Sequence, residues 1–324
     1  MSGTPEPAGT AAGNGRRPAQ DGVLIVDKPA GMTSHDVVAQ VRRALAGGRP
    51  RRDRPKVGHA GTLDPDATGV LVVCVGGATR LVPWLQASRK TYEAELRLGI
   101  TTSTLDASGA VLERRDPAGV DEATLCEALK SFVGDIEQIP PMVSAVRVDG
   151  ERLYAKARRG EVVERRSRAV TIYDLVLEDF VPGPQATASF FVTCSSGTYV
   201  RTLAADVGER LGCGAHLARL RRLGSGRFSV ADAVPLDDVL AAIGDGALER
   251  HLLLPADAVA DYPAVVVDAP TAVDVGHGRP LAATGLEGPV AVLDGEGRLL
   301  AMVADSEGRA RPLAVFAPAQ RGAT

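Results

Sequence analysis

One loop of the chain has the composition expected around a reactive carboxylate. It reads Gly58-His59-Ala60-Gly61-Thr62-Leu63-Asp64-Pro65-Asp66-Ala67-Thr68-Gly69, and the apolar run 70–75 follows at once. Its glycines permit backbone angles that other residues avoid, and Pro65 fixes the turn directly after Asp64. A carboxylate held on a stiff loop beside an apolar strand is poorly solvated, and such groups serve as catalytic acids, bases or nucleophiles. The alternative is that Asp64 only closes an Asx-type turn ahead of the proline.

Other kinds of catalytic site find less support in the sequence. Asp64, Asp66 and His59 could belong to a divalent-ion site, but the 5 histidines are scattered and no second acidic or histidine cluster completes a set of ligands. No Gly-x-Ser-x-Gly follows a strand, and no phosphate-binding P-loop is present. We therefore expect neither a metal ion nor a cofactor.

Arg201 is the best candidate for a partner of Asp64. It ends the stretch Ser196-Gly197-Thr198-Tyr199-Val200-Arg201, which has the character of a helix start. A guanidinium fork would keep the acid ionised and hold its orientation inside an apolar pocket. The alternatives are an ordinary arginine on a helix surface and, for Tyr92 and Tyr199, simple core packing.

The elements that must position these residues follow from hydrophobic periodicity and from turn residues. Residues 91–98 alternate strictly, which predicts a strand with Tyr92 on its apolar side. A helix is expected after Ser34, which we interpret as its N-cap, and it should end at Gly47-Gly48. Further strands are predicted at 22–27, 70–75, 169–180 and 187–194. Further helices are predicted around Trp84, at 121–132 and at 237–243, and one more that the stretch 195–201 opens and that ends near Gly212.

The composition is that of a globular protein with a sizeable core. Of the 324 residues 45% are hydrophobic and 24% charged, and no apolar run is long enough to span a bilayer. Residues 1–21 are rich in Gly, Ala and Pro without an apolar segment, which predicts a disordered tail and not a signal peptide. The 4 cysteines show no CxxC spacing, so we expect reduced thiols, a cytoplasmic protein and no membrane partner.

Positive charge is concentrated in the first two thirds of the chain. Residues 1–230 hold 31 Lys and Arg against 26 Asp and Glu, whereas residues 231–324 hold 6 against 14. The cations gather at 42–56, 147–168 and 219–227. A single charge run is usually a solvated face, but three in one part of an acidic protein favour a polyanionic partner such as nucleic acid.

Several motifs together resemble one family. The loop around Asp64 is similar to the catalytic motif of the bacterial tRNA pseudouridine-55 synthases. Further stretches match that family in the expected order: Asp27-Lys28-Pro29-Ala30-Gly31-Met32-Thr33-Ser34, Lys90-Thr91-Tyr92, Ser196-Gly197-Thr198-Tyr199-Val200-Arg201 and Gly212-Cys213-Gly214-Ala215-His216-Leu217-Ala218-Arg219-Leu220-Arg221-Arg222. The resemblance covers about residues 22–228.

The resemblance implies a role for each matching residue. Asp64 would be the essential aspartate, Arg201 its partner, and Tyr92 the residue that stacks on the uracil and takes the C5 proton. Tyr199 and Leu220 would line the pocket. The family pattern also places His59 against the flipped nucleotide and gives Lys28 and Pro29 a supporting role in the site.

The resemblance also implies a fold and a division of the chain. We expect an α+β fold with a mixed, mainly antiparallel sheet flanked by helices, and then a small C-terminal β-barrel of the PUA type. The catalytic domain would span 22–260 and the RNA-binding barrel 261–324. An insertion at about 142–168 would clamp the stem-loop through Arg158, Arg159, Arg165 and Arg166, although Val143 stands where some members have tyrosine.

The activity implied is the isomerisation of uridine 55 in the T-loop of tRNA, by a monomer without an obligatory protein partner. Two alternatives stay open. One is a guide-RNA-directed relative, which shares the core but lacks the clamping arm. The other is a non-catalytic RNA-folding module that uses the same basic surface.

Overall fold

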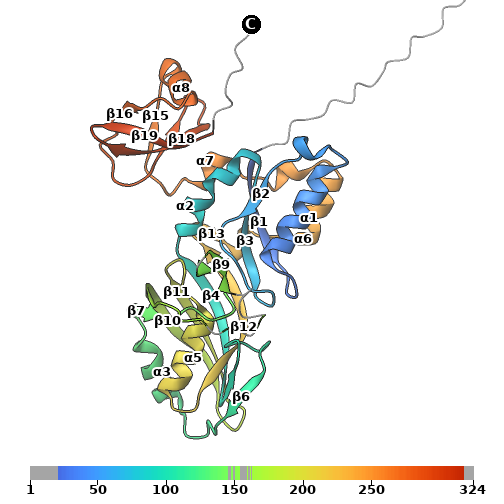
Figure 1. The fold of residues 1–324 in the computed structure, drawn as a ribbon, viewed down its shortest axis with the longest axis vertical. Coiled ribbons are helices and arrows are strands. Elements are labelled where there is room, and N and C mark those ends of the chain that lie inside the picture. Colours follow the sequence, from blue (N-terminus) through green and yellow to red (C-terminus); the bar gives the residue numbers. More distant parts are fainter. Residues whose placement is uncertain are drawn as a thin grey trace, which may run out of the picture.

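The computed structural model describes residues 21–144, 147–148, 150–153, 159, 161 and 163–316. Ten strands of this part of the chain form one continuous sheet (Figure 1). In order across it lie β14 (Val234–Pro235), β1 (Gly22–Lys28), β3 (Thr68–Val75), β12 (Ala215–Ser225), β4 (Lys90–Leu98), β11 (Thr187–Cys194), β10 (Arg168–Val181) and β7 (Gly134–Gln138), with β2 (Val57–His59) beside β3 and β13 (Phe228–Ser229) beside β12. Only the β1–β14 and β3–β12 pairs are parallel, which confirms the mixed, mainly antiparallel sheet.

The sheet has two halves that meet where β3 lies beside β12. Their parallel pairing is short and joins Arg221 to Thr68 and Arg222 to Gly69. Gly69 has a φ of +98°, and a Cβ there would lie 2.2 Å from the carbonyl oxygen of Arg222. Glycine is therefore required at this position both by the backbone angle and by the close approach of the two strands.

Helices cover one face of each half. α1 (Ser34–Ala46) and α6 (Leu236–Gly244) pack on β1 and β3, and α3 (Glu122–Lys130) and α5 (Val200–Arg210) pack on the half built from β4, β10, β11 and β12 (Figure 1). Shorter elements include β5 (Ile100–Thr102), β6 (Val111–Arg114), α2 (Val82–Ala87) and α7 (Pro255–Ala258). The helices expected from the sequence are present, with ends shifted by a few residues.

One predicted helix cap is wrong. The N-cap of α1 is Thr33, whose hydroxyl accepts a hydrogen bond from the Asp36 N–H while the Asp36 carboxylate accepts one from the Thr33 N–H. This reciprocal capping box begins the helix one residue earlier than the Ser34 cap that we expected. Ser34 is 1% exposed and has a different use, described below.

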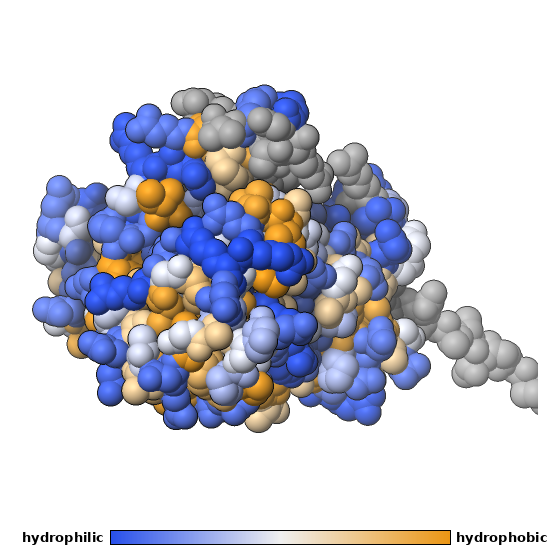
Figure 2. Space-filling view, turned by 90° about the horizontal axis from the view of Figure 1, so that it is seen from below, coloured by the Kyte–Doolittle hydropathy of each residue, from blue (hydrophilic) through white to orange (hydrophobic). Residues whose placement is uncertain are grey.

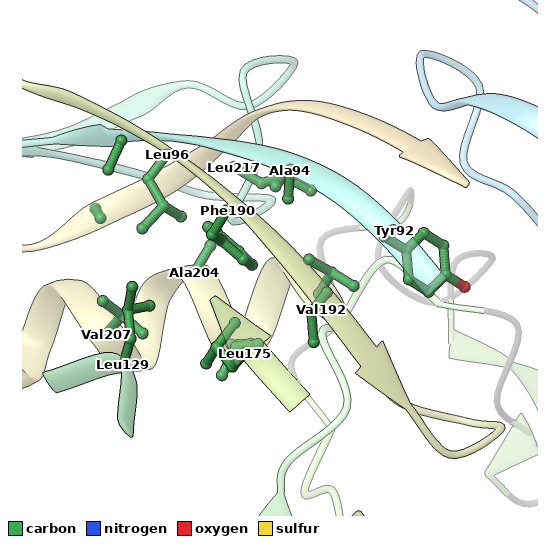
Figure 3. Packing of buried hydrophobic residues seen from close by; sticks show 14 of the residues in the cluster. Tyr92, Ala94, Leu96, Leu129, Leu175, Phe190, Val192, Ala204, Val207 and Leu217 are labelled. Atoms are coloured by element: carbon green, nitrogen blue, oxygen red, sulfur yellow. The ribbon is translucent and has the colours of Figure 1, made fainter. Parts of the chain in front are cut away.

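The predicted alternation along β4 is confirmed. Tyr92, Ala94 and Leu96 face a hydrophobic cluster that lies between the sheet and helices α3 and α5. In Figure 3, Phe190 and Val192 of the neighbouring strand pack beside them, and Tyr92 lies at one end of the cluster with its hydroxyl directed away from it. The core of this half therefore ends at a tyrosine hydroxyl.

A second sheet follows at the C-terminal end. Its order is β15 (Ala264–Val266), β17 (Val290–Leu293), β18 (Leu299–Ser306), β19 (Arg309–Val315) and β16 (Leu281–Ala282), with α8 (Ala269–Gly276) packed beside it. Met302 and Ala291 belong to the same buried hydrophobic cluster as residues of β1 and β3, and the Tyr262 hydroxyl donates to the Trp84 carbonyl at 3.1 Å. This curled sheet confirms the expected small C-terminal β domain.

The surface is mixed in character. Seen from below, hydrophilic residues surround separate hydrophobic patches (Figure 2). Within the described residues, no helix combines the length and the apolar character that crossing a bilayer requires.

Candidate active site

The loop that carries Asp64 lies between β2 and β3, at the junction of the two half-sheets, and buried polar side chains hold it. Ser34 is the first of them. Its hydroxyl accepts a hydrogen bond from the Leu63 N–H at 2.8 Å and lies 3.1 Å from the Leu63 carbonyl oxygen. Leu63 itself is 3% exposed and packs in the core. The residue before Asp64 is thus fixed by both its backbone and its side chain.

Lys28 holds the other side of Asp64. Its ammonium, at the end of β1, donates to the carbonyls of Pro29, Met32 and Pro65 at 2.7, 2.7 and 2.9 Å. Burial lowers the pKa of Lys28 to about 8, although the nearby carboxylates of the loop oppose that change. The three carbonyls compensate for lost hydration, so the lysine ties the Asp64 loop to the turn after β1.

Arg222 is the third buried side chain that holds the loop. It is 1% exposed, and its guanidinium donates to the carbonyls of Val70, Gly61 and Thr62 at 2.6, 3.1 and 3.4 Å. These three hydrogen bonds to backbone carbonyls hold the loop in place around the buried guanidinium. It fixes the loop to the strand that follows it.

Asp64 and Arg201 meet at the open side of this loop. The Nη2 of Arg201 donates to Asp64 Oδ1 at 3.1 Å, and its Nε lies 2.9 Å from Oδ2. Arg201 comes from the first turn of α5 and is 4% exposed, whereas 40% of the Asp64 side chain remains exposed. The pair joins residues 137 positions apart in the chain.

The remaining donors of Arg201 are also used. Nη1 donates to the Thr104 carbonyl at 3.1 Å and lies 3.4 Å from Asp106 Oδ2, while Nη2 also donates to the Val143 carbonyl at 2.9 Å. The other oxygen of Asp106 accepts hydrogen bonds from the hydroxyls of Thr104 and Ser108, both at 2.6 Å. Arg201 therefore lies between two carboxylates and is held in one orientation.

Gln138 fixes the start of the helix that carries Arg201. Its buried side chain accepts a hydrogen bond from the Tyr199 N–H at 3.0 Å and donates to the Tyr199 carbonyl at 3.3 Å. Tyr199 is the N-cap of α5, and no side chain of its own caps the helix. The amide of Gln138 supplies the missing partner from the edge strand β7.

The electrostatic environment of Asp64 has opposing parts. Desolvation raises the pKa of its carboxyl above the ordinary value of 3.8, the Arg201 guanidinium lowers it, and the Asp106 charge raises it again. The net direction is upward. A carboxylate whose pKa is raised is a better base and nucleophile, once ionised, than an exposed aspartate.

A cavity of about 740 Å³ opens above the pair. Asp64, Arg201, Tyr92, Tyr199 and Leu220 all line it. This volume is in the range of small-molecule sites. A cavity of about 850 Å³ lies by α7 and α8 and contains none of these residues, so the pocket above Asp64 is the candidate site.

Two further basic side chains, Arg222 and Lys90, line the cavity. The Arg222 guanidinium lies beside the Tyr92 hydroxyl, and although burial raises the pKa of Tyr92, this charge opposes the increase. Lys90 donates to the Ser88 carbonyl and hydroxyl at 2.7 and 2.8 Å, and burial lowers its pKa to about 7. Tyr92 is therefore a neutral phenol at neutral pH, with a positive charge at its hydroxyl.

The structure brings together most, but not all, of the residues that the sequence singled out. Lys28 contacts the loop directly at the Pro65 carbonyl, and Pro29 is linked to it through the Lys28 ammonium. His59 is half-buried on β2 and is not among the residues that line the cavity. Metal coordination finds no support in the described part of the chain, where no group of three His, Cys, Asp or Glu side chains is placed to hold an ion.

The basic insertion is described in part. β8 (Arg147–Val148) and β9 (Glu151–Arg152) form a hairpin, and Arg158 lies outside the described residues. Arg159 is paired with Glu151 and Glu161, both at 2.6 Å. Arg165 donates to the Pro140 carbonyl at 3.0 Å, and Arg166 is exposed.

Sequence reasoning missed four residues that build the site. The sequence placed Arg222 in a family motif and a cluster of cations, and Ser34 in a family motif and at a helix cap, but it gave neither residue a role in holding the Asp64 loop. Gln138 and Asp106 gave no signal, because an isolated amide and an isolated carboxylate have many uses in turns and strands. Only their partners, far along the chain, reveal what they do.

Comparison with known proteins gives consistent findings along the chain. Residues 49–200 match the model of the TruB family pseudouridylate synthase N-terminal domain, residues 201–260 that of the tRNA pseudouridylate synthase B C-terminal domain, and residues 262–317 that of the tRNA pseudouridine synthase II C-terminal domain. The chain is 46% identical over 303 residues to tRNA pseudouridine synthase B of Thermobifida fusca (strain YX), covering 92% of this chain and 99% of that protein. It is 49% identical over 258 residues to the protein of the same name from Symbiobacterium thermophilum, covering 80% and 82%.

Solved structures are similar at lower identity. A chain in the crystal structure of a Cbf5–Nop10–Gar1 complex has a TM-score of 0.70 and 28% identity, covering 92% of this chain and 85% of that one. A chain in an H/ACA RNP bound to a substrate RNA containing 2′-deoxyuridine has a TM-score of 0.69 and 26% identity, covering 92% and 86%.

Proposed function

The chain belongs to the TruB family of pseudouridylate synthases, and on that premise we propose that it converts uridine 55 in the T-loop of tRNA into pseudouridine. Relatives with 46% and 49% identity carry the name tRNA pseudouridine synthase B, which supports tRNA as the substrate. The single observation that carries the mechanism is the ion pair of Asp64 with a buried Arg201 in the wall of an open cavity.

The reaction needs little more than this site. The N1–C1′ bond breaks, the base turns, C5 bonds to C1′, and the proton on C5 is lost while N1 gains one. No atom is gained or lost and no redox change occurs, so the balance requires no co-reactant. The Asp64 carboxylate can attack C1′, stabilise positive charge there, or take the 2′ proton.

Arg201 and Tyr92 have separate tasks in this proposal. Arg201 holds the Asp64 carboxylate in one orientation, and its contact with Asp106 fixes the guanidinium in turn. The ring of Tyr92 stacks on the uracil, and its hydroxyl takes the C5 proton. Because burial raises the pKa of Tyr92, the phenol must release its own proton to solvent as it accepts the proton of C5, and the Arg222 guanidinium beside the hydroxyl favours that release.

The target base must leave its stack before it can reach this cavity. Extrusion costs a few kcal/mol, and a base in an RNA loop is easier to extrude than one in a duplex. Stacking on Tyr92 and contacts of arginines with phosphates would offset that cost. Arg166 and Arg168, at the base of the insertion and at the rim of the cavity, are candidates for phosphate contacts.

A guide-RNA-directed enzyme is the second candidate, because one structural neighbour comes from an H/ACA RNP bound to a substrate RNA. The higher identity to the tRNA enzymes argues against it, as does the basic insertion at 142–168. The structural neighbours are described in complexes with other proteins, whereas we propose that this chain acts as a monomer. A non-catalytic RNA-folding module would not need the Asp64–Arg201 pair.

The test is to incubate the full chain, in the presence of EDTA, with an unmodified T-arm transcript and to map pseudouridine. The wild type should modify a single uridine, and Asp64→Asn should give no product while it still binds the RNA. Asp66→Asn is a matched control, since Asp66 is exposed in the same loop and should leave product formation intact.

Each candidate gives a different result. Modification without any added guide RNA excludes the guide-directed enzyme. Product formation by Asp64→Asn at the rate of the wild type would remove the proposed mechanism. RNA folding without any pseudouridine would leave only the non-catalytic module.

A further inference from the structure

Ser144 carries a hydroxyl for which the fold provides no partner. The residue is 7% exposed, and its Oγ is buried without a hydrogen bond among the described residues. Buried hydroxyls are almost always paired, because an unpaired one loses its hydration without compensation. Such a group in a native protein calls for an explanation, and a bound ligand is one.

The position of Ser144 indicates which ligand that is. Ser144 lines the same cavity as Asp64 and Arg201. The preceding residue, Val143, accepts a hydrogen bond at 2.9 Å from the Nη2 of Arg201, and this same nitrogen donates to Asp64 Oδ1. The Val143 carbonyl and the Asp64 carboxylate therefore accept hydrogen bonds from the same Arg201 nitrogen, which places Ser144 close to Asp64.

We propose that the Ser144 hydroxyl forms a hydrogen bond with the ribose 2′-hydroxyl of the target uridine. This rests on the proposed function, in which Asp64 acts at C1′. The 2′-hydroxyl is bonded to the carbon next to C1′, so it enters the cavity beside Asp64 together with the reacting atom. Both hydroxyls can donate and accept, so either orientation of the hydrogen bond satisfies the buried Ser144.

Removal of the Ser144 hydroxyl should have a different effect on stability from removal of a hydroxyl that supports the fold. Removing a structural hydroxyl breaks a hydrogen bond and lowers the melting temperature. Removing an unpaired buried hydroxyl relieves a desolvation cost, so the free protein should be as stable as before or more stable. Ser144→Ala should thus weaken substrate binding without lowering the melting temperature of the free protein.

The experiment is a binding cycle on the full chain in the Asp64→Asn background, where the bound RNA is not consumed. Affinity is measured for two T-arm RNAs that differ only in having uridine or 2′-deoxyuridine at the target position. Adding Ser144→Ala should reduce affinity for the uridine RNA by about tenfold, the effect of one buried hydrogen bond. For the 2′-deoxyuridine RNA, which lacks the partner hydroxyl, the same substitution should change affinity by less than about twofold, the deviation expected when two changes do not interact.

Ser225 offers a matched control. Its hydroxyl is also buried without a partner among the described residues, but Ser225 lies at the end of β12 and does not line the cavity. Ser225→Ala should leave affinity for both RNAs unchanged.

Three results would overturn the inference: equal losses for both RNAs, no loss for either, or a lowered melting temperature of Ser144→Ala. Failure of the proposed function is seen separately, as the absence of pseudouridine from the wild-type reaction.

Discussion

Replacing Arg201 by lysine tests how the site holds its carboxylate. In the structure the guanidinium contacts Asp64 with two nitrogens, at 2.9 and 3.1 Å, and it also donates to the carbonyls of Thr104 and Val143. It approaches Asp106 at 3.4 Å as well. A lysine ammonium is one compact charge with three donors, so it cannot reach both ends of this arrangement.

The size of the effect follows from the contacts that are lost. An ammonium placed on Asp64 keeps one charge-assisted hydrogen bond and gives up the second contact with Asp64 and at least one buried carbonyl. At about 1.5–3 kcal/mol for each hydrogen bond that involves a charged group, the loss is about 3–6 kcal/mol. If this interaction free energy is lost in the transition state and not in the bound ground state, kcat decreases by roughly 10²–10⁴-fold.

The assay is single-turnover pseudouridine formation at saturating enzyme, which separates chemistry from RNA binding. Arg210→Lys is the matched control, because Arg210 is exposed in the last turn of the same helix. It should react at the rate of the wild type. Circular dichroism of both variants shows whether the fold is intact.

The reasoning is refuted if Arg201→Lys is folded and its single-turnover rate stays within threefold of the wild-type rate, a tolerance of about 0.7 kcal/mol. In that case charge alone would suffice, and the orientation of the fork would have no role in catalysis.

Three other perturbations have defined outcomes. Desolvation raises the pKa of Asp64, and only its ionised form acts, so the rate of pseudouridine formation should fall as the pH decreases through a pKa above 3.8. Asp106→Asn removes a charge that raises this pKa, so it should move the fall in rate to lower pH. Gly69→Ala should lower the free energy of unfolding by about 3 kcal/mol or more, measured by denaturant titration, because its φ is positive and its Cβ meets a neighbouring strand. Arg166→Gln should reduce the slope of log affinity against log salt by roughly 1, measured with T-arm RNA.

Controls separate these effects from general damage. Gly47 has a φ of +47°, and the Cβ that alanine would add there meets nothing within 4 Å, so Gly47→Ala should cost only about 1 kcal/mol. Arg159 is already neutralised by two glutamates, so Arg159→Gln should change the salt slope less than Arg166→Gln. A pH profile of Asp106→Asn identical to that of the wild type would contradict the electrostatic coupling to Asp64. Equal losses of stability in Gly69→Ala and Gly47→Ala would contradict the argument from the close approach of the strands, and equal changes of salt slope in Arg166→Gln and Arg159→Gln would contradict the argument from ion pairing.

Features that depend on residues close together in the chain could be predicted from the sequence. Alternation along 91–98 placed Tyr92 on the buried face of its strand, because successive side chains point to opposite faces. The Gly47 end of α1 was also evident, since glycine adopts the left-handed conformation that such ends require. The motif around Asp64 and the resemblance it carries pointed to the reaction class.

The central position of β12 was not evident from the sequence. This strand follows the stretch at 212–214 and pairs with β4 on one side and with β3 on the other. Its arginines interrupt the apolar pattern by which buried strands are recognised. Arg222 is buried there only because carbonyls of the Asp64 loop surround its guanidinium.

The sequence by itself pointed to the reactive loop and to Asp64 as its candidate acid, because the glycines, the proline and the apolar run that mark them are neighbours in the chain. Only the tertiary structure decided what holds that acid in place. Ser34, Lys28 and Arg222 bind the loop across separations of 29 to 161 residues, and Gln138 sets the helix start for Arg201 across 61. A buried polar side chain is stable only where its partners converge on it, and that convergence is a property of the folded chain.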